Sequence, residues 1–293
     1  MISILIPTYN YHVQPLVETV HKQCELQQIP FEIVVREDAS TQFLQENKAI
    51  SLLNHVQYLR SEKNIGRTKT RQALADAAKH NWLLFLDADV MPVERDFIEN
   101  YLRVITQEPP VVFGGIMYHE EKPQKEQLLR WVYGKKRESK TAFERRKNPH
   151  YIISQNIMVQ KNTFLEINNH LDDSYGMDNI FSYRLQKKNI SVMHIENPVY
   201  HNGLEKSETF LKKSLLAIET LIDQEKKGTI STDFTSLQKG YTALKKVHIH
   251  HLARLAGRIF NRCIIKNLQS RHPSIPLLDL YKLSHYSKLK DGK

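Results

Sequence analysis

The stretch Trp82-Leu-Leu-Phe-Leu-Asp-Ala-Asp89 is the most informative segment of this chain. Its first five residues are apolar, which is typical of a strand buried on both faces of a parallel sheet. Asp87 and Asp89 follow directly. Ligands of such sheets bind outside the carboxyl ends of the strands, so these two carboxylates mark the place where we expect a site.

Strands and helices alternate on the amino-terminal side of this segment. Apolar runs and helical spacing predict strands at 2–6, 31–35 and 56–59 and helices at 13–28, 43–53 and 67–80. This alternation predicts an α/β fold with a parallel sheet and right-handed crossovers. Polar residues then follow each of the four strands at one edge of the sheet: Thr8-Tyr9-Asn10, Glu37-Asp38-Ala39-Ser40, Lys63-Asn64-Ile65-Gly66 and Asp87-Ala88-Asp89.

The pattern on the carboxyl side is less regular. We predict strands at 111–116, 151–159 and 190–195 and a helix at 178–188. Residues 119–150 are charged and carry few apolar side chains, which indicates a mobile excursion from the fold. From about residue 205 the pattern is helical to the end, with breaks expected near Gly228, Gly240 and Pro273/Pro276.

Composition excludes several classes of protein. The 293 residues are 41% apolar and 25% charged, as in an ordinary globular protein rather than a disordered, collagen-like or disulfide-stapled one. Cys24 and Cys263 lie far apart, which argues against a zinc site or disulfide framework and fits a reducing compartment. The chain has neither a signal-peptide pattern nor about 18 consecutive apolar residues, so we predict a cytoplasmic location.

Asp87 and Asp89 are candidate ligands of a divalent cation. Mg²⁺ and Mn²⁺ favour carboxylate oxygens and keep coordination positions open for substrate phosphates. The alternative is a pair of solvated loop acids. His201, which follows Asn197-Pro-Val-Tyr200, either completes the same metal site or is a structural histidine.

Asp38 and the loop 63–67 are candidates for binding a nucleotide. Asp38 can accept a hydrogen bond from a base or ribose, or it can cap the following helix. No Gly-x-Gly-x-x-Gly follows the first strand, which argues against a nicotinamide or flavin enzyme. Gly66 and the helix N-terminus after it favour an anion, and Arg67 and Arg71 add positive charge. A glycine turn with solvated basic side chains is the alternative.

Asp178 begins the helix predicted at 178–188, within Tyr175-Gly-Met-Asp178-Asn. A carboxylate at this position usually compensates the helix dipole. It can instead act as a general base if it reaches an acceptor hydroxyl. The residues alone leave both roles open.

The positive charge of the chain is concentrated near its end. The net charge is +10, and residues 235–293 alone hold 12 Lys and Arg against 2 Asp and Glu. Within 241–266 a basic residue recurs every four positions from Lys246 to Lys266, and apolar residues share another side of the predicted helix. Such a helix binds an anionic membrane surface, or packs its apolar side on the rest of the protein.

These segments, in this order, resemble the family 2 glycosyltransferases with the GT-A fold. The resemblance covers about residues 1–205 and rests on Ile6-Pro-Thr-Tyr-Asn10, Val35-Arg-Glu-Asp-Ala-Ser-Thr41, Asn64-Ile-Gly-Arg with Arg71, Leu86-Asp-Ala-Asp89, and Tyr175-Gly-Met-Asp-Asn-Ile-Phe-Ser-Tyr-Arg-Leu185. It implies a catalytic domain at 1–205, with a mixed, mainly parallel sheet flanked by helices. A basic helical extension at 206–293 then follows.

The resemblance also implies a role for each residue. The nucleotide-binding set is Pro7, Thr8, Tyr9, Asp38, Asn64, Gly66, Arg67, Arg71 and Asp87. Asp89 and His201 would hold Mn²⁺ or Mg²⁺ on the donor diphosphate, and Asp178 would be the catalytic base. Two motifs depart from the family pattern: Glu37-Asp38-Ala39-Ser40 stands where Asp-Asp-Gly-Ser is usual, and Met177 stands where Glu usually precedes the base.

We therefore expect an inverting glycosyltransferase that uses a nucleotide-diphosphate sugar, with UDP the family's usual nucleotide. A hexosyl or N-acetylhexosaminyl group would pass to a glycan or lipid-linked acceptor in surface polysaccharide or glycolipid synthesis. The enzyme would be peripheral on the inner face of the membrane through 241–266, and no nucleic acid is expected as a partner. The alternatives are a nucleotidyltransferase, a non-catalytic nucleotide-sugar binder, and a nucleic-acid-binding protein that uses its basic tail.

Overall fold

The computed structural model describes residues 1–169 and 174–292 and contains two compact units. The first unit comprises Met1–Tyr118, Ser139–Asp173 and Arg184–Gly203. The second comprises His119–Glu138, Ser174–Tyr183 and Leu204–Lys293. The predicted domain boundary between residues 205 and 206 remains a prediction.

The first unit is built on two sheets. Its strands are β1 (Ile2–Thr8), β2 (Phe31–Glu37), β3 (Val56–Arg60), β4 (Trp82–Leu86), β5 (Val90–Pro92), β6 (Val111–Phe113), β7 (Ile116–Met117), β8 (Asn156–Gln160), β9 (Val192–His194) and β10 (Val199–His201). Among the described residues, seven strands form the main sheet in the order β3-β2-β1-β4-β8-β6-β9, and β5, β10 and β7 form the smaller one. Only β8 runs antiparallel to its neighbours within the main sheet described here. This arrangement confirms the mixed, mainly parallel α/β fold.

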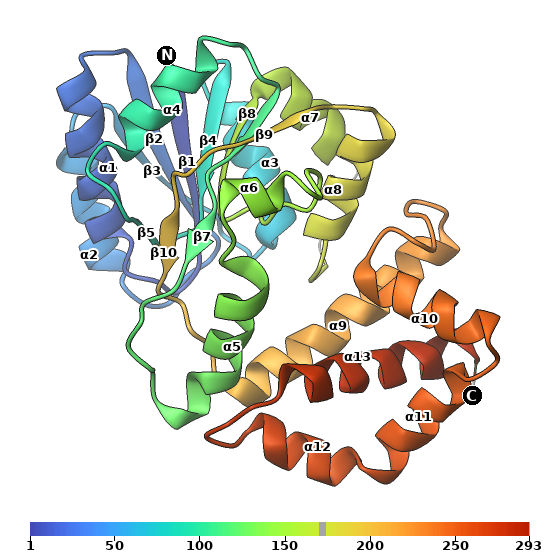
Figure 1. Cartoon of the computed structure of the whole chain (residues 1–293). Coiled ribbons are helices and arrows are strands. Elements are labelled where there is room, and N and C mark those ends of the chain that lie inside the picture. The colour runs from blue at the N-terminus through green and yellow to red at the C-terminus, as the bar shows by residue number, and fades with distance from the viewer. Residues whose placement is uncertain (170–173, 293) are drawn as a thin grey trace. The chain divides into compact units, whose positions relative to one another are not determined.

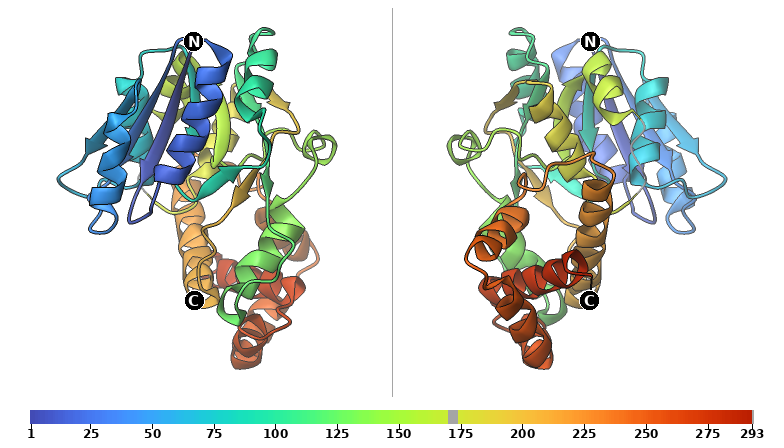
Figure 2. Two further views of the ribbon diagram at one scale, coloured as in Figure 1. Left: turned by 90° about the vertical axis from the view of Figure 1, so that its left-hand side faces the viewer. Right: turned by 90° about the vertical axis from the view of Figure 1, so that its right-hand side faces the viewer.

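Helices cover both faces of the main sheet (Figures 1 and 2). The helices of this unit are α1 (Gln14–Gln27), α2 (Leu44–Lys48), α3 (Arg67–Ala77), α4 (Phe97–Ile105), α6 (Ala142–Arg145) and α7 (Lys161–Asn168), together with a 3₁₀ turn at Ala49–Leu52. A further helix, α8 (Asp178–Lys187), belongs to this unit only from Arg184 on. Side chains alternate along β1, so Ile4 belongs to one apolar cluster with Val17 of α1 and Phe97 of α4 on one face. On the other face Phe85 of β4 meets Phe164 of α7, with ring centroids 4.6 Å apart.

The predicted strand at 111–116 is divided into β6 and β7 by Gly114 and Gly115. Gly115 has φ +100°, and a Cβ there would lie 2.1 Å from Nη1 of Arg145, so this position needs glycine both for its backbone and for space. β8 begins at Asn156 rather than at 151. Two helices, α4 and α7, and two short strands, β5 and β10, lie outside the sequence prediction.

The segment 119–150, for which we expected a mobile excursion, contains several short helical elements. This segment forms a 3₁₀ turn at Lys125–Gln127, α5 (Leu128–Tyr133), a π-helical turn at Gly134–Glu138, and α6. The few apolar residues are concentrated in α5, where Leu128, Leu129 and Trp131 are buried. The apolar signal in this segment is therefore confined to a few residues between charged flanks.

The second unit is helical. It contains α5, α9 (Ser207–Lys226), α10 (Ser236–Lys246), α11 (His250–Ile259), α12 (Asn261–Leu268) and α13 (Ile275–Lys290). Its core consists of Leu129, Phe210, Leu211, Ile264, Leu268, Ile275 and Leu278. α13 packs against α9, α10, α11 and α12. Among the described residues, no helix has both the length and the apolar character needed to cross a membrane.

The single basic helix predicted over 241–266 is wrong. The chain forms three helices there, because His248 adopts a left-handed conformation (φ 59°) after α10 and Phe260 separates α11 from α12. The break near Gly228 is present, with φ 69°. Gly240 lies inside α10, so the break predicted there is wrong.

Candidate functional site

The loops that follow β1 and β2 are joined by Asn10. Its Oδ1 accepts hydrogen bonds from the backbone N–H of Thr41 (2.7 Å) and Gln42 (3.2 Å), and its own N–H donates to Oγ of Ser40 (2.9 Å). Thr8 is buried beside this junction, Pro7 is partly buried, and Tyr9 is 56% exposed. Of the predicted residues on this loop, Tyr9 therefore presents the most surface to a ligand.

Asp38 joins the β2 loop to the loop before α3. Its carboxylate oxygens accept from the backbone N–H groups of Ile65 and Gly66, each at 2.8 Å, and its backbone carbonyl accepts from Nδ2 of Asn64 at 3.1 Å. Gly66 has φ +82°, which a residue with a side chain rarely adopts. Asp38 therefore stabilises the conformation of the loop that carries Asn64 and Gly66. Its predicted contact with the nucleotide remains a prediction.

Replacing Asp38 with alanine is expected to destabilise the first unit. Asp38 is only 4% exposed, so the change would leave two backbone N–H groups without their carboxylate acceptor. We expect the free energy of unfolding to fall by about 2–4 kcal/mol, measured by urea denaturation. Asp76→Ala is the matched control, because Asp76 lies exposed on α3. Equal losses in the two variants would contradict this role.

Asp87 lies between two arginines of α3. Its oxygens accept from Nη2 of Arg67 at 2.5 Å and from Nη2 of Arg71. Arg71 also donates to the backbone carbonyl of Ser154 at 3.0 Å, which places the segment before β8 at the same edge of the sheet. The side chain of Arg67 is 44% exposed whereas that of Arg71 is 7% exposed, so Arg67 is the one more open to an anionic ligand.

Asp89 meets the other predicted metal ligand. Its Oδ2 lies 3.2 Å from Nε2 of His201, and Nδ1 of His201 lies 3.1 Å from the hydroxyl of Tyr118. Asp89 Oδ2 and His201 Nε2 thus form a chain with buried Tyr118 that holds the imidazole by both nitrogens. Burial disfavours ionisation of Asp89, but the hydrogen bond and charge of His201, together with Arg67, outweigh it and lower the pKa of Asp89.

Two further residues crowd Asp89. A Cβ on Gly203 would lie 1.8 Å from its Oδ2, so only glycine fits beside the carboxylate. The pKa of Tyr11 is raised, first by burial and then by the negative charge of Asp89. Gly203 was not predicted, although it lies only two residues after His201, and no local pattern marks Tyr11, Tyr118 or Ser154.

Asp89 and His201 are suited to a divalent cation. An octahedral ion with bonds of about 2.1 Å places adjacent donor atoms about 3.0 Å apart, close to the observed 3.2 Å. A carboxylate and an imidazole together suit Mn²⁺. In the described part of the chain no cluster of three or more His, Cys, Asp or Glu residues is arranged for a metal, so substrate or water oxygens would have to supply the other ligands.

The structure therefore unites the predicted residues of the first unit in two groups. One group joins Asp38, Asn64 and Gly66, and the other joins Arg67, Arg71 and Asp87. Asp89, two residues after Asp87, is paired with His201. Asp178 begins α8 and belongs to the second unit, and Met177 before it is 6% exposed. An apolar residue there is buried where the family pattern has a charged one.

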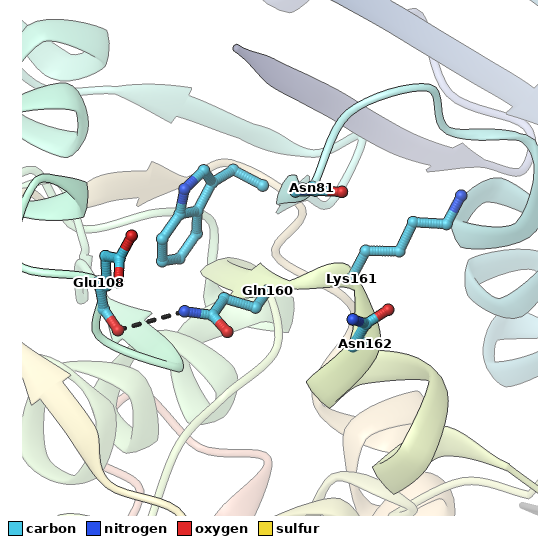
Figure 3. A pocket seen from close by; sticks show the side chains of 6 residues that line it. Asn81, Glu108, Gln160, Lys161 and Asn162 are labelled. Carbon is cyan, nitrogen blue, oxygen red and sulfur yellow. Dashed lines mark hydrogen bonds between the residues drawn. The ribbon is translucent and has the colours of Figure 1, made fainter.

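A pocket in the first unit lies away from these residues (Figure 3). Asn81, Trp82, Glu108, Gln160, Lys161 and Asn162 line it, and Gln160 Nε2 donates to the carbonyl of Glu108 at 3.2 Å. Trp82 is the first residue of β4, whereas Asp87 follows the last. The pocket thus belongs to the opposite end of that strand.

Comparison with known proteins gives a family model and several relatives that match this chain. A family model described as "Glycosyl transferase family 2" matches residues 3–167, which is more than half of the chain. A curated relative from Haemophilus influenzae, named "Uncharacterized glycosyltransferase", is 33% identical over 126 residues. The match covers 42% of this chain and 39% of the relative, so this chain spans about two fifths of that relative's length.

Solved structures share the fold. A mannosyltransferase from Pyrobaculum calidifontis, in complex with GDP-Man and Mn²⁺, has a TM-score of 0.59 at 14% identity, over 100% of this chain and 88% of that one. S. aureus TarS 1-349 in complex with UDP-GlcNAc has a TM-score of 0.52 at 16% identity, over 100% and 92%. At this level of identity the likeness concerns the fold.

Proposed function

This chain belongs to glycosyl transferase family 2, and on that premise we propose that it transfers a sugar from a nucleotide-diphosphate sugar to an acceptor hydroxyl with inversion at the anomeric carbon. The observation that carries the proposal is the pairing of Asp89 with His201 directly after the Asp87–arginine cluster. Together these groups offer cationic side chains for a diphosphate and two donor atoms for a divalent metal.

Asp89 and His201 would hold the metal, which we propose to be Mn²⁺ or Mg²⁺. A bound divalent cation neutralises the charge of a departing diphosphate. Tyr118 keeps the His201 ring in place through Nδ1. The mannosyltransferase with a similar fold is recorded with Mn²⁺, which supports dependence on a divalent metal.

The nucleotide would lie along the loops that Asp38 and Asn10 hold together. Tyr9 is exposed and offers a ring for stacking on a base. Gly66 lets the backbone come close, and Arg67 and Arg71 add positive charge. Of the relatives with this fold, one is recorded with UDP-GlcNAc and another with GDP-Man. We propose UDP, with a hexosyl or N-acetylhexosaminyl group, as the donor.

A thermal-shift screen of nucleotide sugars with and without Mn²⁺ tests this proposal. A ligand at about 100 times its Kd should raise the melting temperature by about 5 °C or more, and the rise should need the metal. Release of free nucleotide on addition of an acceptor would show transfer. If no nucleotide sugar changes the melting temperature in either condition, the proposed function is wrong.

Asp178 is our proposed catalytic base, on the strength of the resemblance. It would take the proton of the acceptor hydroxyl as that oxygen attacks the anomeric carbon. The acceptor would be a glycan or a lipid-linked sugar in surface polysaccharide or glycolipid synthesis. An acceptor of that kind places the enzyme on the inner face of the membrane, and we propose that the basic region 241–266 provides the attachment.

Replacing Gly203 with alanine is expected to weaken metal binding. The added Cβ would collide with Oδ2 of Asp89 and displace the carboxylate from His201. We expect the apparent affinity for Mn²⁺ to fall about 10- to 100-fold, measured by the Mn²⁺ dependence of nucleotide binding. Gly240→Ala is the control, because nothing lies within 4 Å of that Cβ and α10 should gain stability. Unchanged Mn²⁺ dependence in Gly203→Ala would contradict the assignment.

A further inference from the structure

Large apolar side chains are exposed along α11 and its two ends. We call the group Val247, Ile249, Leu252, Leu255, Ile259 and Phe260 the α11 patch. Each of them is between 41% and 63% exposed, and they make up six of the fifteen exposed large hydrophobic residues in the described part of the chain. An apolar patch of this kind on a protein surface usually marks a binding site.

α11 presents its large residues outward because Gly257 faces α13. Gly257 is buried, and a Cβ there would lie 2.0 Å from Oγ of Ser284 on α13. With 3.6 residues per turn, Leu252, Leu255 and Ile259 fall on one side of the helix and Gly257 on the other. Figure 1 shows α11 and α12 beside α13 in the second unit. An ordinary surface helix buries its apolar stripe, whereas α11 leaves that stripe open.

The orientation of α11 is also secured by polar contacts on its buried side. Arg254 and His250 lie 3.8 and 3.9 Å from the carboxylate of Asp291, and Oγ of Ser287 donates to the carbonyl of His250 at 3.4 Å. Turning the apolar stripe inward would break these contacts and drive Leu255 against α13. The exposed stripe is therefore part of the folded state.

The chain segment that carries the patch holds positive charge only, and Asp291 meets α11 on its buried side. Residues 234–278 contain eight Lys and Arg and no Asp or Glu. Five of the eight are exposed within or beside the patch: Lys245, Lys246, Arg258, Arg262 and Lys266. An apolar stripe with a basic border is complementary to a surface whose outer layer is anionic and whose interior is apolar.

We propose that the α11 patch inserts into the anionic surface of a lipid bilayer, with Leu255, Ile259 and Phe260 among the acyl chains and the basic border on the headgroups. A second copy of the chain fits less well, because a symmetric dimer would bring the two basic borders together. A nucleic acid would match the charge and leave the apolar side chains in water. A role of this membrane contact in catalysis rests on the proposed function, because only a lipid-linked acceptor requires the enzyme to lie on a membrane.

Flotation with vesicles of phosphatidylglycerol and phosphatidylcholine tests the patch. The full chain should float with vesicles that contain phosphatidylglycerol, and less so in high salt. Leu255→Ser/Ile259→Ser should lower binding at least about tenfold, because each change removes a large apolar side chain from the bilayer. Leu26→Ser/Leu52→Ser is the matched control, since both leucines are highly exposed in the first unit.

The charge of the border is tested in the same assay. Arg258→Glu/Arg262→Glu should lower binding to anionic vesicles at least about tenfold, whereas Lys22→Glu/Lys48→Glu, the same charge change at exposed sites of the first unit, should not. Equal flotation of the wild type and Leu255→Ser/Ile259→Ser would overturn the proposal. A dimer without vesicles that this pair converts to a monomer would also overturn it, in favour of a second copy.

Failure of this inference and failure of the proposed function are distinguishable. Donor binding is read by the melting temperature with a nucleotide sugar and Mn²⁺, without vesicles. A protein that binds donor but does not float overturns the membrane surface alone. A protein that floats through α11 but binds no nucleotide sugar overturns the proposed function and supports the membrane surface.

Discussion

Replacing Asp89 with alanine is expected to lower the rate of sugar transfer by about 10²-fold or more. Asp89 provides one of the two donor atoms of the proposed metal site, and its Oδ2 lies 3.2 Å from Nε2 of His201. Without the carboxylate, a single imidazole remains from this pair. Binding of the nucleotide sugar should then lose its dependence on Mn²⁺, as measured by thermal shift or calorimetry.

Two variants make the Asp89 result specific. Asp96→Ala removes an exposed carboxylate of the same unit and should leave transfer unchanged. Asp89→Asn keeps the size of the side chain but loses its charge, so it should recover some activity at high Mn²⁺ concentration. If Asp89→Ala binds nucleotide with the Mn²⁺ dependence of the wild type, the metal assignment is wrong.

Replacing Asp178 with asparagine is expected to lower transfer by about 10²- to 10⁴-fold, the usual contribution of a general base. Asparagine has nearly the same shape but cannot take a proton at neutral pH. Asp178 also lies in the first turn of α8, where a negative charge stabilises the helix, so the melting temperature should fall only slightly. Donor affinity should stay within about twofold of the wild type, because this role concerns the acceptor.

Asp233→Asn is the control for this change, because Asp233 is exposed and lies outside every helix of the second unit. The pH dependence of transfer gives a second readout, since the loss of a base removes the acidic limb of the profile. Normal turnover by Asp178→Asn would contradict the assignment. This experiment tests the assignment directly at a position next to a departure from the family pattern, where buried Met177 replaces the usual Glu.

The sequence predicted β1 to β4 and α1 and α3 well, because apolar runs and helical spacing are local properties. It also predicted that polar residues after those strands share one edge of the sheet. It missed α4 and α7, and it did not predict α5, which is buried through Leu129 and Trp131. In that segment the apolar signal is only a few residues long.

Residue type and spacing alone were enough to predict three features: the alternation of strands and helices, the polar residues at the strand ends, and the net positive charge of residues 235–293. Only the tertiary structure decided which groups meet. Asp89 and His201 lie 112 residues apart in the chain, and Asp38 uses its carboxylate on the loop at Ile65 and Gly66. The outward orientation of the apolar side of α11 depends on packing. Gly257 allows a close fit against α13, and this contact leaves the large apolar side chains on the opposite, exposed side of the helix.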